Sequence, residues 1–351
     1  MTVTAPPVRE HSAPEPTAGR RLIDKVFKAR EIAVAGVLVL MLLATQVSNS
    51  EFLSEQGVKD LLLNATILVL VATGQAIVVI TRNVDLSVGS VLGISAFAAG
   101  DYLQGGGSSL IAVLYAVAVG AVFGVLNGAL VSLGKVPALV VTLGTLYVVR
   151  GIDSIWVGSQ QIVAADLPDA FVDFGHDGLW VVPYLALLAG AVLLCVGYYL
   201  RSYRSGRDMY ALGSSPEAAS LAGVPVRKRI MTAYVLCGAL AGLAGALYLA
   251  RFGNVDSGTG NGYELTVVSA VVVGGVAFTG GSGTVYGAAL GALLLTSINS
   301  VLPAIGVSSV WVTAINGVLL LLAIAVDRIL ALRVAAVLRK QAAQMRSARH
   351  A

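Results

Sequence analysis

Long apolar runs recur along the whole chain, and they restrict its fold more than any other feature. Runs such as Leu110–Leu133 and Leu179–Leu200 contain no charged residue. A helix of roughly 20 apolar residues crosses a bilayer core of about 30 Å. A transmembrane β-barrel would instead show alternating strands of about ten residues, and these runs do not alternate. The chain is therefore predicted to be an all-α, polytopic integral membrane protein.

The composition supports a membrane protein and excludes a large soluble domain. Hydrophobic residues make up 57% of the chain and charged residues 12%, against about 25% charged in soluble domains. We attribute the net charge of +4 to Lys and Arg residues in cytoplasmic loops, which set the topology of a membrane protein. We therefore expect the protein to contact membrane lipid and not to bind nucleic acid. Cys195 and Cys237 lie inside apolar runs, where we expect reduced thiols rather than a disulfide or a metal site.

About ten transmembrane helices are expected. They are predicted at Ile32–Val47, Leu61–Ile80, Leu86–Tyr102, Leu110–Leu133, Val136–Val149, Leu179–Leu200, Ile230–Ala250, Leu265–Phe278, Thr284–Val301 and Ile305–Val326. The Val136 and Leu265 segments are shorter than a bilayer requires, which is typical of re-entrant or buried segments.

The charges predict how these helices are oriented. Residues 1–31 are predicted to be a disordered basic tail, 32–327 the transmembrane domain with a cytoplasmic loop at 201–229, and 328–351 a second basic tail. With both tails in the cytoplasm, only Lys59, Arg150 and Arg251 of the 23 Lys and Arg residues fall outside. We therefore expect a multi-pass membrane protein with both termini inside the cell. Blocks of four helices starting at Leu61 and Ile230 are five helices apart, so a repeat relating them would be inverted.

The sequence contains no recognisable catalytic or metal site. Its Gly134-Lys135 pair lacks the rest of a phosphate-binding loop, and His11, His176 and His350 lie far apart in the sequence. Ionisable residues are scarce within the apolar runs, which disfavours a proton-coupled carrier. We expect no enzymatic activity and no bound cofactor.

The segment TRNVDLSVGS, residues 81–90, combines an acidic residue with small polar ones. Asp85 precedes a helical run and can cap it by accepting free backbone N–H groups. Ser87, Gly89 and Ser90 weaken the helix, as in broken transporter helices that face a cavity. Two interpretations remain open: a plain helix cap, or a role in the translocation pathway or its gating.

The segment VPALVVTLGTLYVVRG, residues 136–151, places Thr142 and Thr145 on one helix face. Their hydroxyls could bind a polar solute, or could bond to carbonyls one turn earlier. Arg150 is either an anchor that extends to the outer membrane surface or part of a mouth facing a docking protein. These residues and Asn127 are the further candidates for the pathway.

The stretch GRDMYALGSSPEAASLAGVPVRKR, residues 206–229, is polar in an apolar chain. Ser215 as N-cap, Pro216 at the first position and Glu217 in the first turn predict a short helix through Leu221, which ends at Gly223. Such a helix either enters a groove on a cytoplasmic partner or merely connects two membrane helices. The glycine-rich FTGGSGTVYG, residues 278–287, predicts a buried turn.

Together these segments resemble the permease subunits of bacterial ABC sugar importers of the ribose, xylose, rhamnose and autoinducer-2 type. The resemblance rests on VDLSVGS at 84–90, on VPALVVTLGT with Arg150-Gly151, and on the 206–223 stretch, with the 278–287 turn as a weaker match. One feature departs from the family, because Arg82-Asn83 stands where Gly-Gly is usual. The longer I-x-L-P ending seen in many other importers does not follow the Glu-Ala-Ala sequence either.

The resemblance implies how the protein works. The cytoplasmic loop would be the coupling helix that docks on a separate ATPase subunit, through Gly206, Arg207, Tyr210, Gly213, Glu217, Ala218, Ala219 and Gly223. ATP and Mg would bind that partner, while an extracytoplasmic solute-binding protein would deliver the sugar to a pathway formed with a second permease copy or a paralogue. The alternatives are an ABC permease for branched-chain amino acids or nucleosides, and a stand-alone carrier or channel.

Overall fold

The computed structural model describes residues 18–158, 160–308, 311, 314–322, 324–325 and 328–329. Within them the chain folds into a bundle of helices with four very short strands. The elements are α1 (Ala18–Ser48), α2 (Glu55–Ile80), α3 (Val88–Gln104), α4 (Ser109–Ser132), α5 (Ala138–Val157), β1 (Ile162–Val163), the 3₁₀ turn η1 (Ala164–Asp166), α6 (Asp169–His176), β2 (Gly178–Leu179), β3 (Val182–Pro183), α7 (Tyr184–Ser202), α8 (Arg204–Ser214), α9 (Pro216–Leu221), α10 (Val226–Phe252), β4 (Asn254–Val255), α11 (Tyr263–Val273) and α12 (Val285–Ala304).

Seven of the described helices are long and apolar enough to cross a membrane, namely α1 (over Glu31–Ser48), α2, α4, α5, α7, α10 and α12. The Val136 segment was expected to be short, but α5 has 20 residues because the helix continues past Arg150 to Val157. Two of the predicted membrane helices fall below spanning length: α3 with 17 residues and α11 with 11. The predicted tenth helix, Ile305–Val326, lies partly outside the described residues.

The predicted N-terminal boundary was wrong in part. Disorder was expected through residue 31, but α1 begins at Ala18, so residues 18–31 are helical. Residues 1–17 and the tail from 330 onward lie outside the described residues. α1 packs against α12, where the Thr284 hydroxyl donates to the Glu31 carboxylate at 2.6 Å. This contact ties α1 to the 278–287 turn.

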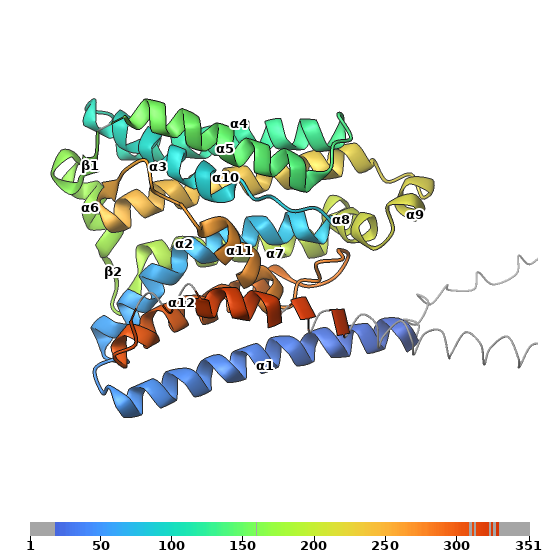
Figure 1. The fold of residues 1–351 in the computed structure, drawn as a ribbon, viewed down its shortest axis with the longest axis horizontal. Coiled ribbons are helices and arrows are strands. Elements are labelled where there is room, and N and C mark those ends of the chain that lie inside the picture. Colours follow the sequence, from blue (N-terminus) through green and yellow to red (C-terminus); the bar gives the residue numbers. More distant parts are fainter. Residues whose placement is uncertain are drawn as a thin grey trace, which may run out of the picture.

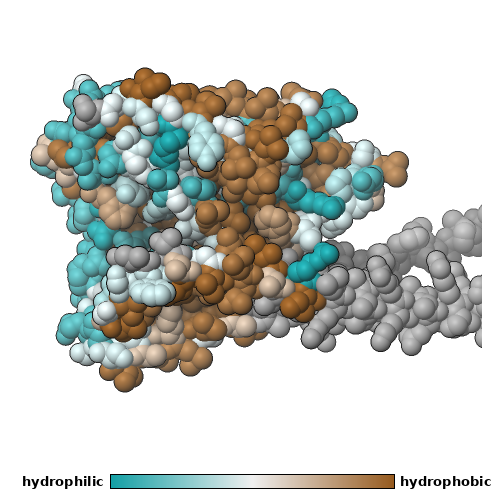
Figure 2. Space-filling model, viewed as in Figure 1, coloured by the Kyte–Doolittle hydropathy of each residue, from teal (hydrophilic) through white to brown (hydrophobic). Residues whose placement is uncertain are grey.

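The core lies where α2, α3, α4 and α10 meet. α2 is buried almost continuously from Leu63 to Ile80, and α10 packs against α4, α3 and α2. Glycines allow α4 and α10 to approach closely, since a Cβ on Gly120 would overlap the Gly238 carbonyl oxygen. By contrast, α4, α5 and α7 expose many large apolar side chains. Figure 2 shows such apolar surface across the middle of the molecule, with polar surface toward its ends.

The bundle has two ends of different character (Figure 1). One carries α8 and α9; the other carries α6 and two small antiparallel sheets, in which β1 pairs with β4 and β2 with β3. Two irregular segments interrupt the helices and position the candidate site. We call residues 81–87, between α2 and α3, the Asp85 turn, and residues 253–262, between α10 and α11, the Asp256 turn.

Candidate translocation site and coupling segment

The Asp85 turn runs back into the bundle beside the helix that precedes it. With its amide oriented to satisfy both partners, Gln75 donates to the Asp85 carbonyl at 3.1 Å and accepts from the Asp85 N–H at 3.2 Å. Gln75 lies more than one helical turn before the end of α2 at Ile80. The chain has therefore reversed direction, and Asp85 lies level with the interior of α2.

Side chains from other helices satisfy the backbone of this turn. The Val84 carbonyl accepts from the Tyr234 hydroxyl of α10 at 3.1 Å and from Thr142 of α5 at 3.4 Å. Irregular backbone at membrane depth is tolerated only when it is shielded by protein or lines a water-filled cavity. Arg82 adopts φ 66°, the left-handed conformation that glycine enters without a steric penalty. The position where the family usually has glycine thus keeps a glycine-like backbone here.

The Asp85 carboxylate is buried in a polar cluster. Its Oδ1 accepts the Ser87 backbone N–H at 2.9 Å and the Ser87 hydroxyl at 2.6 Å. Asn127 of α4 lies 3.5 Å from both carboxylate oxygens and donates to the Ser87 hydroxyl at 2.8 Å. Asp85 does not cap α3 as one interpretation expected: the helix begins at Val88 with Ser87 as its N-cap residue and has no side-chain cap, and Asp85 binds the N–H of Ser87 in the turn before it.

The hydroxyls of Thr142 and Thr145 contact acceptors within α5 and also acceptors on other segments. Each has a single hydrogen, which is shared between a carbonyl one turn back, that of Ala138 or Val141 respectively at 3.0 Å, and an acceptor on another segment. Thr145 also lies 2.6 Å from the Asn127 side-chain oxygen, which links α5 to α4. Gly89 and Ser90 are buried in the first turn of α3, where the Ser90 hydroxyl donates to the Ser87 carbonyl at 2.8 Å. The structure thus gathers the candidates from Asp85 to Thr145 into one cluster.

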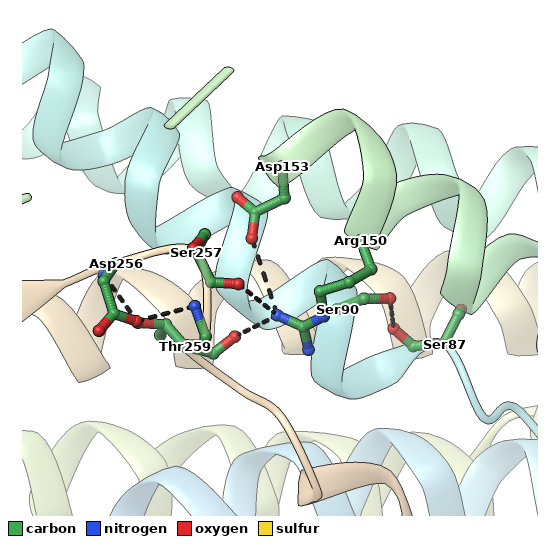
Figure 3. A network of polar contacts seen from close by, with 8 residues as sticks. Ser87, Ser90, Arg150, Asp153, Asp256, Ser257 and Thr259 are labelled. Carbon is green, nitrogen blue, oxygen red and sulfur yellow. Dashed lines mark hydrogen bonds and ion pairs between the residues drawn. The ribbon is translucent and has the colours of Figure 1, made fainter. Parts of the chain in front are cut away.

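Arg150 lies apart from that cluster and is not the lipid-surface anchor that one interpretation expected. Its side chain is 19% exposed and turns into the protein toward the Asp256 turn. It donates to the carbonyls of Thr259 at 2.7 Å and Ser257 at 3.4 Å, and it lies 3.7 Å from the buried Asp153 carboxylate (Figure 3). The anchor interpretation fails because the bonds from Nη1 to these carbonyls turn the guanidinium into the protein.

Sequence reasoning missed several residues of the site. They are Gln75, Asp153, Tyr234, Asp256, Ser257 and Thr259. One signal was available, because Asn254-Val255-Asp256 repeats the tripeptide Asn83-Val84-Asp85. Gln75 and Tyr234 have no such signal, since their contacts depend on how the helices pack. Among the described residues, no group of three or more His, Cys, Asp or Glu could hold a metal ion.

The short helix of the 206–229 stretch forms as predicted. Ser215 caps α9 by accepting the Ala218 N–H at 3.3 Å, Pro216 is the first helical residue, and Gly223 beyond the end has φ +78°. Glu217 and Ala218 are exposed, whereas Ala219 is buried against the bundle. Leu221 is 90% exposed, an unusual position for a leucine. The helix therefore presents a mixed apolar and acidic surface.

The earlier residues of this stretch attach it to the bundle. A Cβ on Gly206 would lie 2.5 Å from the Leu200 Cα, and Arg207 donates to the Ser202 carbonyl at 2.7 Å. The Tyr210 hydroxyl donates to the Gly283 carbonyl at 3.1 Å; burial raises the pKa of Tyr210 to about 12, so it remains a donor. Gly213 packs directly on the backbone of Ile80 and Gly281. The predicted docking residues thus divide into an exposed set and an anchoring set.

Comparison with known proteins places the chain in a family. The model of the branched-chain amino acid transport system permease component matches residues 57–324. The chain belongs to this permease family. The matched residues include the Asp85 cluster, the Asp256 turn and the whole of α8 and α9.

Curated relatives cover nearly all of the chain. It is 37% identical to the autoinducer 2 import system permease protein LsrC of Enterobacter sp. strain 638, over 84% of this chain and 84% of that protein. It is 33% identical to the ribose import permease protein RbsC of Escherichia coli K12, over 88% of this chain and 97% of that protein. No solved structure matches the chain. The apolar helices and the permease family together establish a multi-pass membrane protein.

Proposed function

We propose that this permease is the transmembrane subunit of an ATP-driven ABC importer for a monosaccharide or sugar-like solute. The names of the two relatives, for autoinducer 2 and ribose import, support this substrate class. The cluster around Asp85 supplies hydroxyl, amide and carboxylate groups, which are the groups that bind polyhydroxylated solutes. The family description itself favours a second candidate, a branched-chain amino acid.

Coupling to a separate ATPase is supported mainly by one observation, the exposed surface of α9. A leucine that is 90% exposed beside an exposed glutamate suits a partner groove better than water. The two helices that flank α9 in the chain are joined to each other, because the Arg229 guanidinium of α10 binds the Asp208 carboxylate of α8 at 2.8 Å. Both ends of α9 are therefore held. A docking helix must be rigidly attached if a partner's motion is to reach the membrane. ATP and Mg are assigned to that partner, and this chain performs translocation without catalysis.

The remaining partners follow from the same assignment. An extracytoplasmic solute-binding protein delivers the solute to the end of the bundle that carries α6, and a second permease copy or paralogue completes the pathway. The chain resides in the bacterial plasma membrane with both termini in the cytoplasm, which places α8 and α9 inside with the clustered Arg and Lys residues.

The test is uptake of labelled ribose, other monosaccharides, autoinducer 2 and leucine in cells lacking the gene. Native chain should restore uptake of one sugar-like solute, while Glu217→Arg should lower it at least about tenfold if charged hydrogen bonds to the partner are lost. Glu55→Arg is the matched control and should restore uptake. It reverses the charge of an exposed glutamate in the first turn of α2, at the other end of the bundle.

Two results would contradict the proposal in different ways. Restoration of leucine uptake alone would replace the substrate class while leaving coupling intact. Full uptake with Glu217→Arg, at equal amounts of chain in the membrane, would remove Glu217 from docking on the ATPase.

A further inference from the structure

The two irregular segments share a sequence and a local structure. Asn83-Val84-Asp85 follows α2, and Asn254-Val255-Asp256 follows α10. In each, the aspartate Oδ1 accepts the backbone N–H two residues later, from Ser87 at 2.9 Å and from Gly258 at 2.8 Å. Each Oδ1 also accepts a hydroxyl, from Ser87 at 2.6 Å and from Thr259 at 3.3 Å. The Asp85 and Asp256 turns therefore share a tripeptide and an aspartate-capped turn. They differ in that the hydroxyl comes from the second residue after Asp85 and the third after Asp256, and Asn254-Val255 also pairs with β1.

The helices around the two turns are related in the same way. α10 packs against α3 and α4, while α2 packs against α11 and α12; α3 contacts α4, and α11 contacts α12. Exchanging α2, α3 and α4 for α10, α11 and α12 thus reproduces the pattern of contacts. α2 and α10 run in opposite directions through the membrane in the orientation given above. The contacts are those of an inverted repeat, in which the Asp256 turn is the outer counterpart of the Asp85 turn.

The Asp256 turn descends far along α3. Gly93 of α3 lies against the Thr259 carbonyl, where a Cβ would overlap the oxygen. Gly260 lies equally close to the carbonyl oxygen of Gly89, in the first turn of α3 and remote from its end at Gln104. These glycines let irregular backbone lie directly on the helix. The turn covers the same end of α3 at which the Asp85 turn arrives from the other side.

α5 contacts both turns through bonds from side chains to backbone carbonyls. Thr142 reaches Val84 of the Asp85 turn, and Arg150, about two helical turns further on, reaches Ser257 and Thr259 of the Asp256 turn. Asp153 lies beside Arg150 with a fully buried side chain, and neither of its oxygens accepts a hydrogen bond from the described residues. A buried carboxylate favours a charged neighbour, so it holds the guanidinium in place.

We propose that the Asp256 turn is the outer gate of the translocation pathway and that Arg150 holds it closed. The Asp85 turn, held by Thr142 and Tyr234, is the corresponding inner gate. The proposal rests on the proposed transport function. The hydrogen bonds from Arg150 to the turn go to carbonyl oxygens, and the Asp256 side chain is exposed, so the turn can withdraw without leaving a buried charge of its own.

The test measures access to α3 from outside the cell. Ser90 is fully buried and lies between Ser87 and Arg150 in Figure 3. Ser90→Cys is introduced into a chain carrying Cys195→Ala and Cys237→Ala, and its reaction rate with a small membrane-impermeant thiol reagent is measured on intact cells. Arg150→Gln should raise the rate about tenfold, as expected for the loss of charge-assisted hydrogen bonds.

Arg251→Gln is the matched control. It breaks an ion pair with Asp60 at 3.1 Å, with the arginine side chain 16% exposed, outside both turns. The rate should then stay at the native value. If Arg150→Gln fails to reach the membrane, Arg150→Lys decides the question. Lysine keeps the charge, but its side chain is shorter than the one whose Nη1 contacts both carbonyls, so it should give a smaller increase than Arg150→Gln.

Equal rates in the native and Arg150-substituted chains would overturn the gate, and so would an equal rise with Arg251→Gln, which would indicate general loosening. Neither result depends on which solute is carried. A wrong substrate assignment would therefore appear in the uptake assay and leave the labelling result unchanged.

Discussion

Individual glycines decide how closely the elements at the α8 and α9 end of this permease meet. Gly213, near the end of α8, lies against the carbonyl oxygen of Ile80 and the backbone nitrogen of Gly281. Those two atoms are themselves hydrogen-bonded at 2.9 Å. Three segments distant in sequence therefore meet backbone to backbone. The contact connects the 206–229 stretch directly to the residue that precedes the Asp85 turn.

Gly213→Ala should destabilise the protein, because its methyl group would overlap both backbone atoms. Overpacking of this kind costs about 1–3 kcal/mol. The midpoint of thermal unfolding in detergent should fall, as should the amount of chain in the membrane. Gly190→Ala is the control: a Cβ there meets nothing within 4 Å, so its midpoint should stay the same or rise. Equal midpoints for the two variants would show that the junction can yield.

At the scale of elements, the Asp85 turn is held by hydroxyl groups on side chains of neighbouring helices, and each hydroxyl can be removed by an apolar substitution. Tyr234→Phe removes one donor to the Val84 carbonyl and leaves the ring. Loss of a buried hydrogen bond costs about 0.5–1.5 kcal/mol, so the thermal midpoint should fall modestly. Tyr248→Phe on the same helix is the comparison, since no described residue bonds to its hydroxyl. A larger effect at Tyr248 would contradict the role given to Tyr234.

The same element shows what sequence reasoning could and could not reach. Asp85, Ser87 and Asn127 were candidates because polar residues in apolar helices are conspicuous, and the cap at Ser215 follows from local chemistry. The destination of Arg150 could not be predicted, because its partners are backbone carbonyls of a segment more than a hundred residues away. Every residue has a backbone carbonyl, so residue types do not indicate which carbonyl will accept a hydrogen bond. The helical start of α1 at Ala18 was also missed, because the basic residues there resemble a solvated tail.

At the scale of the whole molecule, charge separates the two ends of the bundle. Arg201, Arg207 and Arg229 lie at the end with α8 and α9, whereas the segment around α6 carries Asp166, Asp169, Asp173 and Asp177 without Lys or Arg. Figure 1 places α6 and α9 at opposite ends of the molecule. Retention of positive charge on the cytoplasmic side then predicts that α9 faces the interior of the cell.

This orientation predicts the side from which each end reacts. In the chain without native cysteines, Asp173→Cys should react with an impermeant maleimide on intact cells, and Ser220→Cys should react only in inverted membrane vesicles. Both positions are exposed in the structure, so protection of either reflects the membrane and not burial. Reaction of Ser220→Cys from outside the cell would reverse the orientation. It would also remove α9 from the compartment that holds ATP, so coupling and gating would have to be reassigned together.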